Sequence, residues 1–105
     1  MRIYKLILSF ALLSLCITQS IAQEHNVQPK NGLVPDAKTA ITIAVAVWLP
    51  IYGEKQIASQ KPYVATLQKG KWTVTGSLPP GWRGGTAIAV ISQADGKVIR
   101  VSHGK

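Results

Sequence analysis

The first 22 residues of this 105-residue chain have the layout of a secretory signal peptide, which sets how much of the chain remains to fold. Two cations precede an apolar run over residues 6–17, and a small-residue ending leads to Ala22. The run is too short to span a bilayer core, which takes about 20 residues. We therefore expect cleavage after Ala22 and a periplasmic or secreted product. Lipidation at Cys16 is the alternative, and the bulky Leu15 before it disfavours that alternative.

The remaining 83 residues contain no cysteine, because the only one lies in the leader. Disulfides, thiolate zinc sites and thiol chemistry are thereby excluded from the mature part. A chain of this length also cannot hold a two-domain cofactor enzyme. The polar residues 23–33, with Pro29 and Gly32, are expected to form a flexible lead-in, and residues 34–105 a single domain. No further apolar run reaches membrane-spanning length, so no stable membrane insertion is expected after cleavage.

The segment after Val34-Pro35-Asp36 is predicted to be the main helix. Proline suits a first helical turn, and an aspartate is favourable near the positive end of the helix dipole. Apolar residues then recur at helical spacing, at Ala37, Ala40, Ile41, Ala44, Val45 and Trp48. Pro50 should interrupt the hydrogen bonding near the helix end, and Gly53 should end the last turn. A helix that is apolar nearly all round is expected to be buried or to meet a partner.

Four segments after this helix are predicted as strands: Lys61–Gln68, Lys71–Leu78, Thr86–Ser92 and Lys97–His103. Alternation places these residues on the core side: Tyr63, Ala65, Leu67, Trp72, Val74, Leu78, Ile99 and Val101. Lys69-Gly70 and Asp95-Gly96 are tight-turn signals, and the Pro- and Gly-rich stretch Leu78–Gly85 is a loop. The third strand is apolar on both faces, which predicts a central position. The expected fold is α+β: one main N-terminal helix packed on a curled four-stranded antiparallel sheet.

The constellations that carry catalysis are missing from the sequence. A serine nucleophile needs a positioned base, and the two histidines lie in the lead-in (His25) and beside the C-terminus (His103). Asp36 and Asp95 have capping and turn roles to fill. Neither a metal site nor a phosphate-binding loop is supported by the ligand spacing. We therefore expect no enzyme activity, no cofactor and no metal.

The aromatic residues are the candidate contact groups. Trp72 is assigned to the sheet core, and Trp48 and Tyr52 should stack four residues apart at the helix end. Trp82-Arg83, in the loop with Pro80 and Gly81, is the most suggestive pair, since tryptophan and arginine are typical interface hot spots. The alternative is that Trp82 folds back and plugs the open end of the sheet. The candidate partner-binding residues are Trp82, Arg83, Tyr52, Pro80 and Gly81.

The mature part carries ten lysines and arginines against four carboxylates, and these cations are dispersed along the chain. Outside the cytoplasm, such a surface favours an acidic protein face or an anionic envelope polymer, and no nucleic acid is expected.

Five segments resemble a known family: GLVPDAKTA, AVWLPIYGEKQI, KPYVATL, GKWTVTGSLPPGWRGG and DGKVIRVSHGK. In this order they resemble the immunity proteins of bacterial polymorphic toxin systems that have a nuclear transport factor 2-like fold. The resemblance covers residues 32–105, and its specific parts are Pro-Ile-Tyr-Gly-Glu and Leu-Pro-Pro-Gly-Trp-x-Gly-Gly. It implies an antiparallel sheet wrapped on a helix, in the cystatin-like class and in reduced form, that binds and neutralises a cognate toxin. The helix is more apolar than this resemblance implies, at Thr42, Ile43, Val45 and Ala46, which suggests a homodimer through its apolar face.

Two further functions fit the same residues. One is a small periplasmic domain that binds a ligand or envelope component in a sheet-lined pocket. The other is a cystatin-like protease inhibitor that inserts a hairpin and a tryptophan loop into a cleft. The function that we expect is that of an immunity protein acting by surface occlusion.

Overall fold

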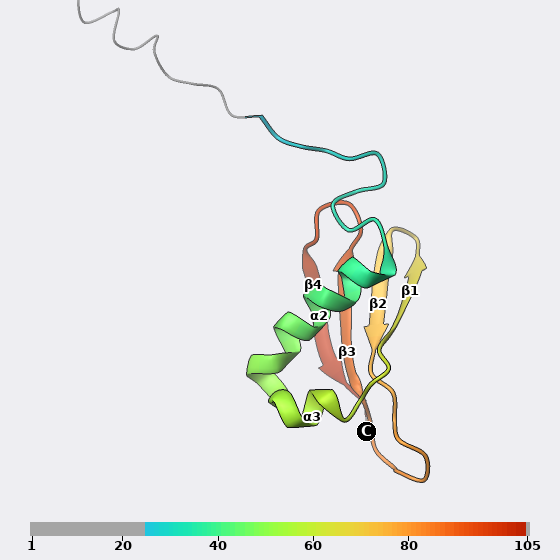
Figure 1. The fold of residues 1–105 in the computed structure, drawn as a ribbon. Helices are drawn as coiled ribbons and strands as arrows, with labels where there is room; N and C mark the ends of the chain where they lie inside the picture. The colour runs from blue at the N-terminus through green and yellow to red at the C-terminus, as the bar shows by residue number, and fades with distance from the viewer. Residues whose placement is uncertain (1–24, 105) are drawn as a thin grey trace, which may run out of the picture.

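The computed structural model describes residues 25–104, so the leader predicted for residues 1–22, with Cys16 and the cleavage after Ala22, lies outside the described residues. Two helices, α2 (Ala37–Tyr52) and α3 (Glu54–Ala58), precede four strands in the described part. Figure 1 shows α2 lying across one face of the sheet, with α3 beside the end of the sheet that carries the chain's C-terminus. The predicted α+β class is confirmed.

Helix α2 begins and ends on local signals in the sequence. The Asp36 carboxylate caps its start by accepting hydrogen bonds from the Thr39 backbone N–H (2.8 Å) and hydroxyl (2.7 Å). These bonds hold the pKa of Asp36 below its ordinary value. Pro50 lies inside the last turn without ending the helix, which stops at Tyr52. The Gly53 N–H then donates to the Leu49 carbonyl, at 2.9 Å.

The core lies between α2 and the sheet. Ala40, Ala44 and Trp48 are completely buried and repeat every four residues, so they form a single stripe along the helix. This stripe packs across strands β1, β2 and β3. The two alanines let the helix backbone approach the sheet closely, and Trp48 fills the wider space at the helix end. Leu49 and Ile51 are the large apolar side chains of α2 that stay exposed, at 38% and 55%.

The sheet is an antiparallel meander in the order β1-β2-β3-β4. Its strands are β1 (Val64–Gln68), β2 (Lys71–Thr75), β3 (Ala87–Ser92) and β4 (Val98–His103). The predicted turn at Lys69-Gly70 and the central position of β3 are confirmed. The sheet is not strongly curled, which corrects the expectation of a curled sheet (Figure 1). Strands of five or six residues, covered by one helix, accumulate little coiling.

The predicted core positions of Leu78 and Leu67 are wrong. Strand β2 ends at Thr75. The Gly76 N–H still donates to β3, at the Ala87 carbonyl (3.0 Å), but the Ser77 N–H turns away to the Gln60 carbonyl (2.7 Å). Leu78 therefore lies beyond the sheet and is 40% exposed. Leu67 stays 42% exposed because it lies on an edge strand, and that strand begins at Val64 rather than Lys61.

The predicted core position of Ile99 is also wrong. The register shifts between Val90 and Ile91, so that Val90 lies opposite Arg100 while Ile91 lies opposite Val98. Ile99 is the additional residue of this bulge and is 45% exposed. The core-facing residues of β4 are therefore Val98 and Val101, and strict alternation fails at this point.

The segment before α2 is fixed to the far end of the sheet. The N–H groups of Leu33 and Val34 donate to the carbonyls of Ala94 and Gln93, both at 3.0 Å. The Val34 carbonyl accepts a 2.8 Å hydrogen bond from the indole Nε1 of Trp72. Val34 is 1% exposed. It therefore belongs to the core and connects the helix layer to β2.

Gln60 closes the opposite end of the sheet, where β2 and β3 separate. Its side chain is 94% buried, and its Oε1 accepts a 2.8 Å hydrogen bond from the Ala87 N–H. The amide packs against Gly76, where an added Cβ would lie 2.3 Å from that oxygen. Only glycine leaves room for Gln60 at this position.

Candidate functional site

The loop between β2 and β3 displays its tip residues through a type II turn. The turn runs from Pro79 to Trp82, with Pro80 and Gly81 in its two central positions. The Trp82 N–H donates to the Pro79 carbonyl at 3.1 Å, and Gly81 has a φ of +79°. Proline followed by a residue with positive φ is the pattern that a type II turn requires. The sequence of the tip therefore fixes the direction in which Trp82 leaves the loop.

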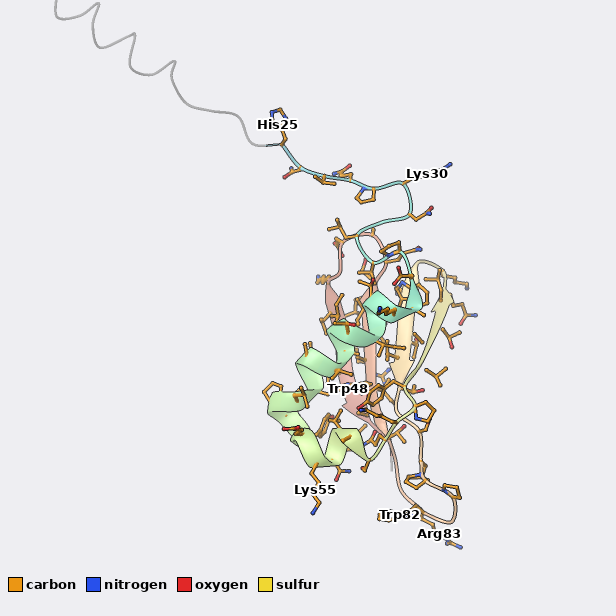
Figure 2. All side chains as sticks on the ribbon, viewed as in Figure 1. His25, Lys30, Trp48, Lys55, Trp82 and Arg83 are labelled. Atoms are coloured by element: carbon orange, nitrogen blue, oxygen red, sulfur yellow. The ribbon has the colours of Figure 1, made fainter. Side chains whose placement is uncertain are left out.

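Trp82 and Arg83 lie at the tip of this loop, beyond the end of the sheet (Figure 2). Trp82 is 69% exposed, and Arg83 is exposed as well. Trp82 therefore does not fold back to plug the sheet. A tryptophan buries about 150–250 Å² in a typical contact, so one left in solvent is a large unused apolar surface.

Both ends of the loop are tied to the domain. At the start, the Ser77 hydroxyl donates to the Pro62 carbonyl (2.5 Å), and the backbone bonds described above continue from β2. At the end, the Gly104 N–H donates to the Thr86 carbonyl at 3.0 Å. Gly85 lies so close to the Gly104 backbone that a Cβ there would overlap it. The loop thus carries its tip on a fixed base.

Tyr52 contacts His103 at this same end of the molecule. Its hydroxyl lies 3.2 Å from His103 Nδ1, and the two rings meet edge to face with centroids 5.7 Å apart. Both side chains line a hollow of about 440 Å³, together with Ile51, Gln56, Gln60, Gly85, Thr86 and Ala87. Because Gly85 belongs to the loop, this hollow lies between the helix ends and the loop base. Uncharged groups and one histidine line it, so it suits a neutral side chain or ligand with hydrogen-bonding groups.

Trp48 and Tyr52 do not form the predicted stack. Trp48 is buried and packs edge to face on Tyr63, with centroids 5.8 Å apart, whereas Tyr52 pairs with His103. The Tyr63 hydroxyl donates to the Ile57 carbonyl at 2.8 Å, and burial raises the pKa of this hydroxyl. Trp48 is therefore a core residue, and Tyr52 alone reaches the surface.

The five predicted site residues lie at one end of the domain. Pro80, Gly81, Trp82 and Arg83 share the loop tip, and Tyr52 lines the hollow at the loop base. Sequence reasoning missed two residues that complete this end, His103 and Gln60. His103 could have been found from alternation, because it lies two positions after the core-facing Val101. No local pattern marks Gln60.

A second hollow, of about 700 Å³, lies at the other end of the domain, lined by residues 26–33 and the turns at Gly70 and Gln93. Within residues 25–104, no three potential metal ligands come together, and no helix is long and apolar enough to cross a membrane. Exposed apolar side chains occur beside both hollows: Val27 and Leu33 line the one at the far end, and Trp82 lies at the tip of the loop whose base borders the other.

The chain matches a known protein family. A family model described as NTF2 fold immunity protein matches residues 39–105, which include the sheet, the loop and all of α2 except Ala37 and Lys38. Neither the curated proteins nor the solved structures contain a significant match.

Proposed function

Because the chain belongs to the family of NTF2 fold immunity proteins, we propose that it neutralises a cognate toxin by occluding the toxin's surface with its loop end. A cognate toxin is the partner that this family implies, and immunity proteins of this kind are typically non-catalytic. Membership of this family agrees with the prediction that the chain is a binding protein without enzyme activity. The resemblance stated from the sequence is confirmed by the family match.

The proposal that the loop makes the contact is supported by an exposed tryptophan at its tip and by the fixed base of the loop. Hot spots in protein interfaces are enriched in tryptophan and arginine, and Trp82 and Arg83 are adjacent and exposed at the loop tip. A type II turn and the hydrogen bonds at both loop ends hold this tip before any partner arrives. Little conformational entropy is then lost on binding, which favours affinity.

The hollow beside Tyr52 and His103 supports a second part of the same contact. It lies at the loop base, and its size falls within the range of about 300–1,000 Å³ that is usual for small-ligand sites. In the proposed complex it receives a neutral side chain of the toxin. The alternative is that it binds a small envelope ligand, independently of any protein.

The test is replacement of both tip residues, Trp82→Ala with Arg83→Ala. We expect the double variant to bind a toxin that the unmodified chain neutralises at least roughly a hundredfold more weakly, since hot-spot residues cost about 2–4 kcal/mol each. Titration calorimetry with that toxin and survival of toxin-producing cells are the two measurements. Tm should stay unchanged, because both side chains are exposed.

The matched control is Val27→Ala with Lys30→Ala, an exposed apolar residue and an exposed cation at the other end of the domain. This control should bind and protect as well as the unmodified chain. If the loop variant protects fully while the control does not, the contact lies at the opposite end. Recovery of a bound envelope glycan, with no toxin binding, would favour the alternative.

Export is the second part of the proposal. A toxin that reaches the cell from outside is met first in the envelope, and the arrangement of residues 1–22 matches a secretory signal. Mass spectrometry of the protein from a periplasmic fraction should give an N-terminus at Gln23. A lipidated N-terminus at Cys16 would point to membrane anchoring instead, and an intact Met1 in the cytoplasm would contradict export.

A further inference from the structure

The sheet has a second face, which α2 and α3 do not cover (Figure 1). Val74 and Ala89 are opposite one another and buried beneath the helix layer. Their neighbours Thr73 and Val90 therefore point to the other side, because successive residues of a strand alternate between faces. In register with them lie Thr66 on β1 and Arg100 on β4. We call the side of the sheet that carries this row the outer face.

The strand residues of the outer face carry positive charge, and none of them is acidic. Lys71 lies on it, since its partners Gln68 and Ser92 belong to the same side, and so does Arg100. Residues 25–104 contain nine lysines and arginines and three carboxylates. Those carboxylates lie at the N-cap of α2 (Asp36), at the start of α3 (Glu54) and in the β3–β4 turn (Asp95). Thr73 and Val90 lie between the two cations.

We infer that the outer face is a second docking surface and that it takes an acidic face of a partner protein. This inference rests on the proposed function in taking that partner to be the toxin. Asp95 borders this face at the Ser92 side chain, which lies opposite Lys71. The two cations outnumber this carboxylate, so the face attracts acidic side chains and repels basic surfaces, which gives on-rate and specificity. Thr73 and Val90 beside the cations, and Thr75 and Ile88 beyond them, provide the neutral contact area that a protein interface needs.

The pattern favours a protein over other polyanions. Lys71 and Arg100 lie on β2 and β4, with β3 between them, so they do not form a dense cluster. Proteins that bind duplex DNA neutralise about 6–10 phosphates, and segments that bind anionic lipid carry about 4–8 clustered cations. The outer face has two cations within a mostly neutral surface. It fits a few carboxylates at fixed spacing.

The outer face also adjoins the proposed loop contact. Strand β2 leads from Thr75, at one end of this face, directly into the loop. Ile88 lies opposite Thr75 on β3, half-buried on the same side. A toxin seated on the loop tip therefore reaches the apolar end of the outer face first and the two cations beyond it.

The experiment uses poly-L-glutamate as the acidic probe and the purified protein. Binding is followed by titration calorimetry and by amide chemical shifts, and the shifts should concentrate at Thr66, Thr73 and Val90. The variant Lys71→Gln with Arg100→Gln should bind roughly tenfold more weakly, the loss expected for two exposed ion pairs. Raising the ionic strength from roughly 0.05 to roughly 0.3 M should remove most of this difference.

The control is Lys38→Gln with Lys55→Gln, which removes the same charge from α2 and α3 on the other side of the sheet (Lys55 in Figure 2). It should keep poly-L-glutamate affinity within about twofold. Equal losses in the two variants would overturn the inference, because net charge would then explain the binding. Tighter binding of a DNA duplex or of phosphatidylglycerol vesicles than of poly-L-glutamate would overturn it as well.

The toxin separates this inference from the proposed function. The Lys71 and Arg100 variant should slow toxin association and leave dissociation almost unchanged, whereas the loop variant should speed dissociation. If both variants bind the toxin as well as the unmodified chain does, both proposals are contradicted. Loss in the loop variant alone keeps the proposed function and overturns the outer face. Loss in the Lys71 and Arg100 variant alone keeps the outer face and overturns the loop.

Discussion

Replacing Trp48 by alanine is expected to lower the free energy of unfolding by about 3–5 kcal/mol. The side chain is completely buried at the end of the Ala40–Ala44–Trp48 stripe, and it packs edge to face on Tyr63. The neighbours in the stripe are alanines, which cannot grow into the space that it leaves. A domain of this size has about 4–10 kcal/mol of total stability, so most of it is lost. Urea unfolding followed by circular dichroism measures the change.

Two conservative variants separate volume from hydrogen bonding. The indole Nε1 of Trp48 is buried without a partner within the described residues, whereas that of Trp72 donates to the Val34 carbonyl. Trp48→Phe therefore removes an unsatisfied donor, and Trp72→Phe removes a hydrogen bond that fixes the segment before α2. We expect Trp72→Phe to cost about 1–2 kcal/mol more than Trp48→Phe. Equal costs would contradict this assignment of the two indoles.

The helix and the turns could be predicted from the sequence because their signals are local. Asp36 caps α2 through Thr39, three residues away, and Gly53 ends it. Lys69-Gly70 is a two-residue turn between alternating strands. These features depend on residues within one turn of each other, and so a single sequence contains them in full.

The errors fall where distant segments decide. Leu78 lies outside the core because the Ser77 N–H donates to the Gln60 carbonyl, which turns the chain away from the sheet. Ile99 leaves it because a bulge opposite Val90 shifts the register. No local sequence pattern indicates the gap that Gln60 fills or the position of the bulge. Alternation therefore predicts the strands but not where they end or slip.

The candidate site divides in the same way. The turn Pro79–Trp82 follows from proline and glycine in neighbouring positions, so the exposed tryptophan could be located from the sequence. The contact of Tyr52 with His103 joins residues 51 positions apart, and Trp48, the predicted partner of Tyr52, packs on Tyr63 instead. The outer face is a property of register across four strands, which only the assembled sheet shows.

Replacing Gln60 by leucine is expected to destabilise the domain by about 1–3 kcal/mol. Leucine keeps most of the volume but removes the Oε1 atom, so the buried Ala87 N–H loses its 2.8 Å acceptor. That N–H lies where β2 and β3 separate at the loop base, and no strand is available to replace the acceptor. Urea unfolding gives the stability. Hydrogen exchange at the Ala87 amide should accelerate more than exchange at Val74, in the middle of β2.

Gln56→Leu is the matched control, because it makes the same chemical change on an exposed side chain one turn earlier. It should change stability by less than about 0.5 kcal/mol and leave the Ala87 exchange rate unaltered. A Gln60 variant as stable as this control would mean that the sheet end is held without the side-chain acceptor. A destabilised Gln60 variant should also bind the toxin less well, because the hollow and the loop base share this residue. Trp82→Ala, by contrast, should weaken toxin binding and leave stability unchanged. The two variants therefore distinguish a residue that supports the loop base from one that contacts the toxin.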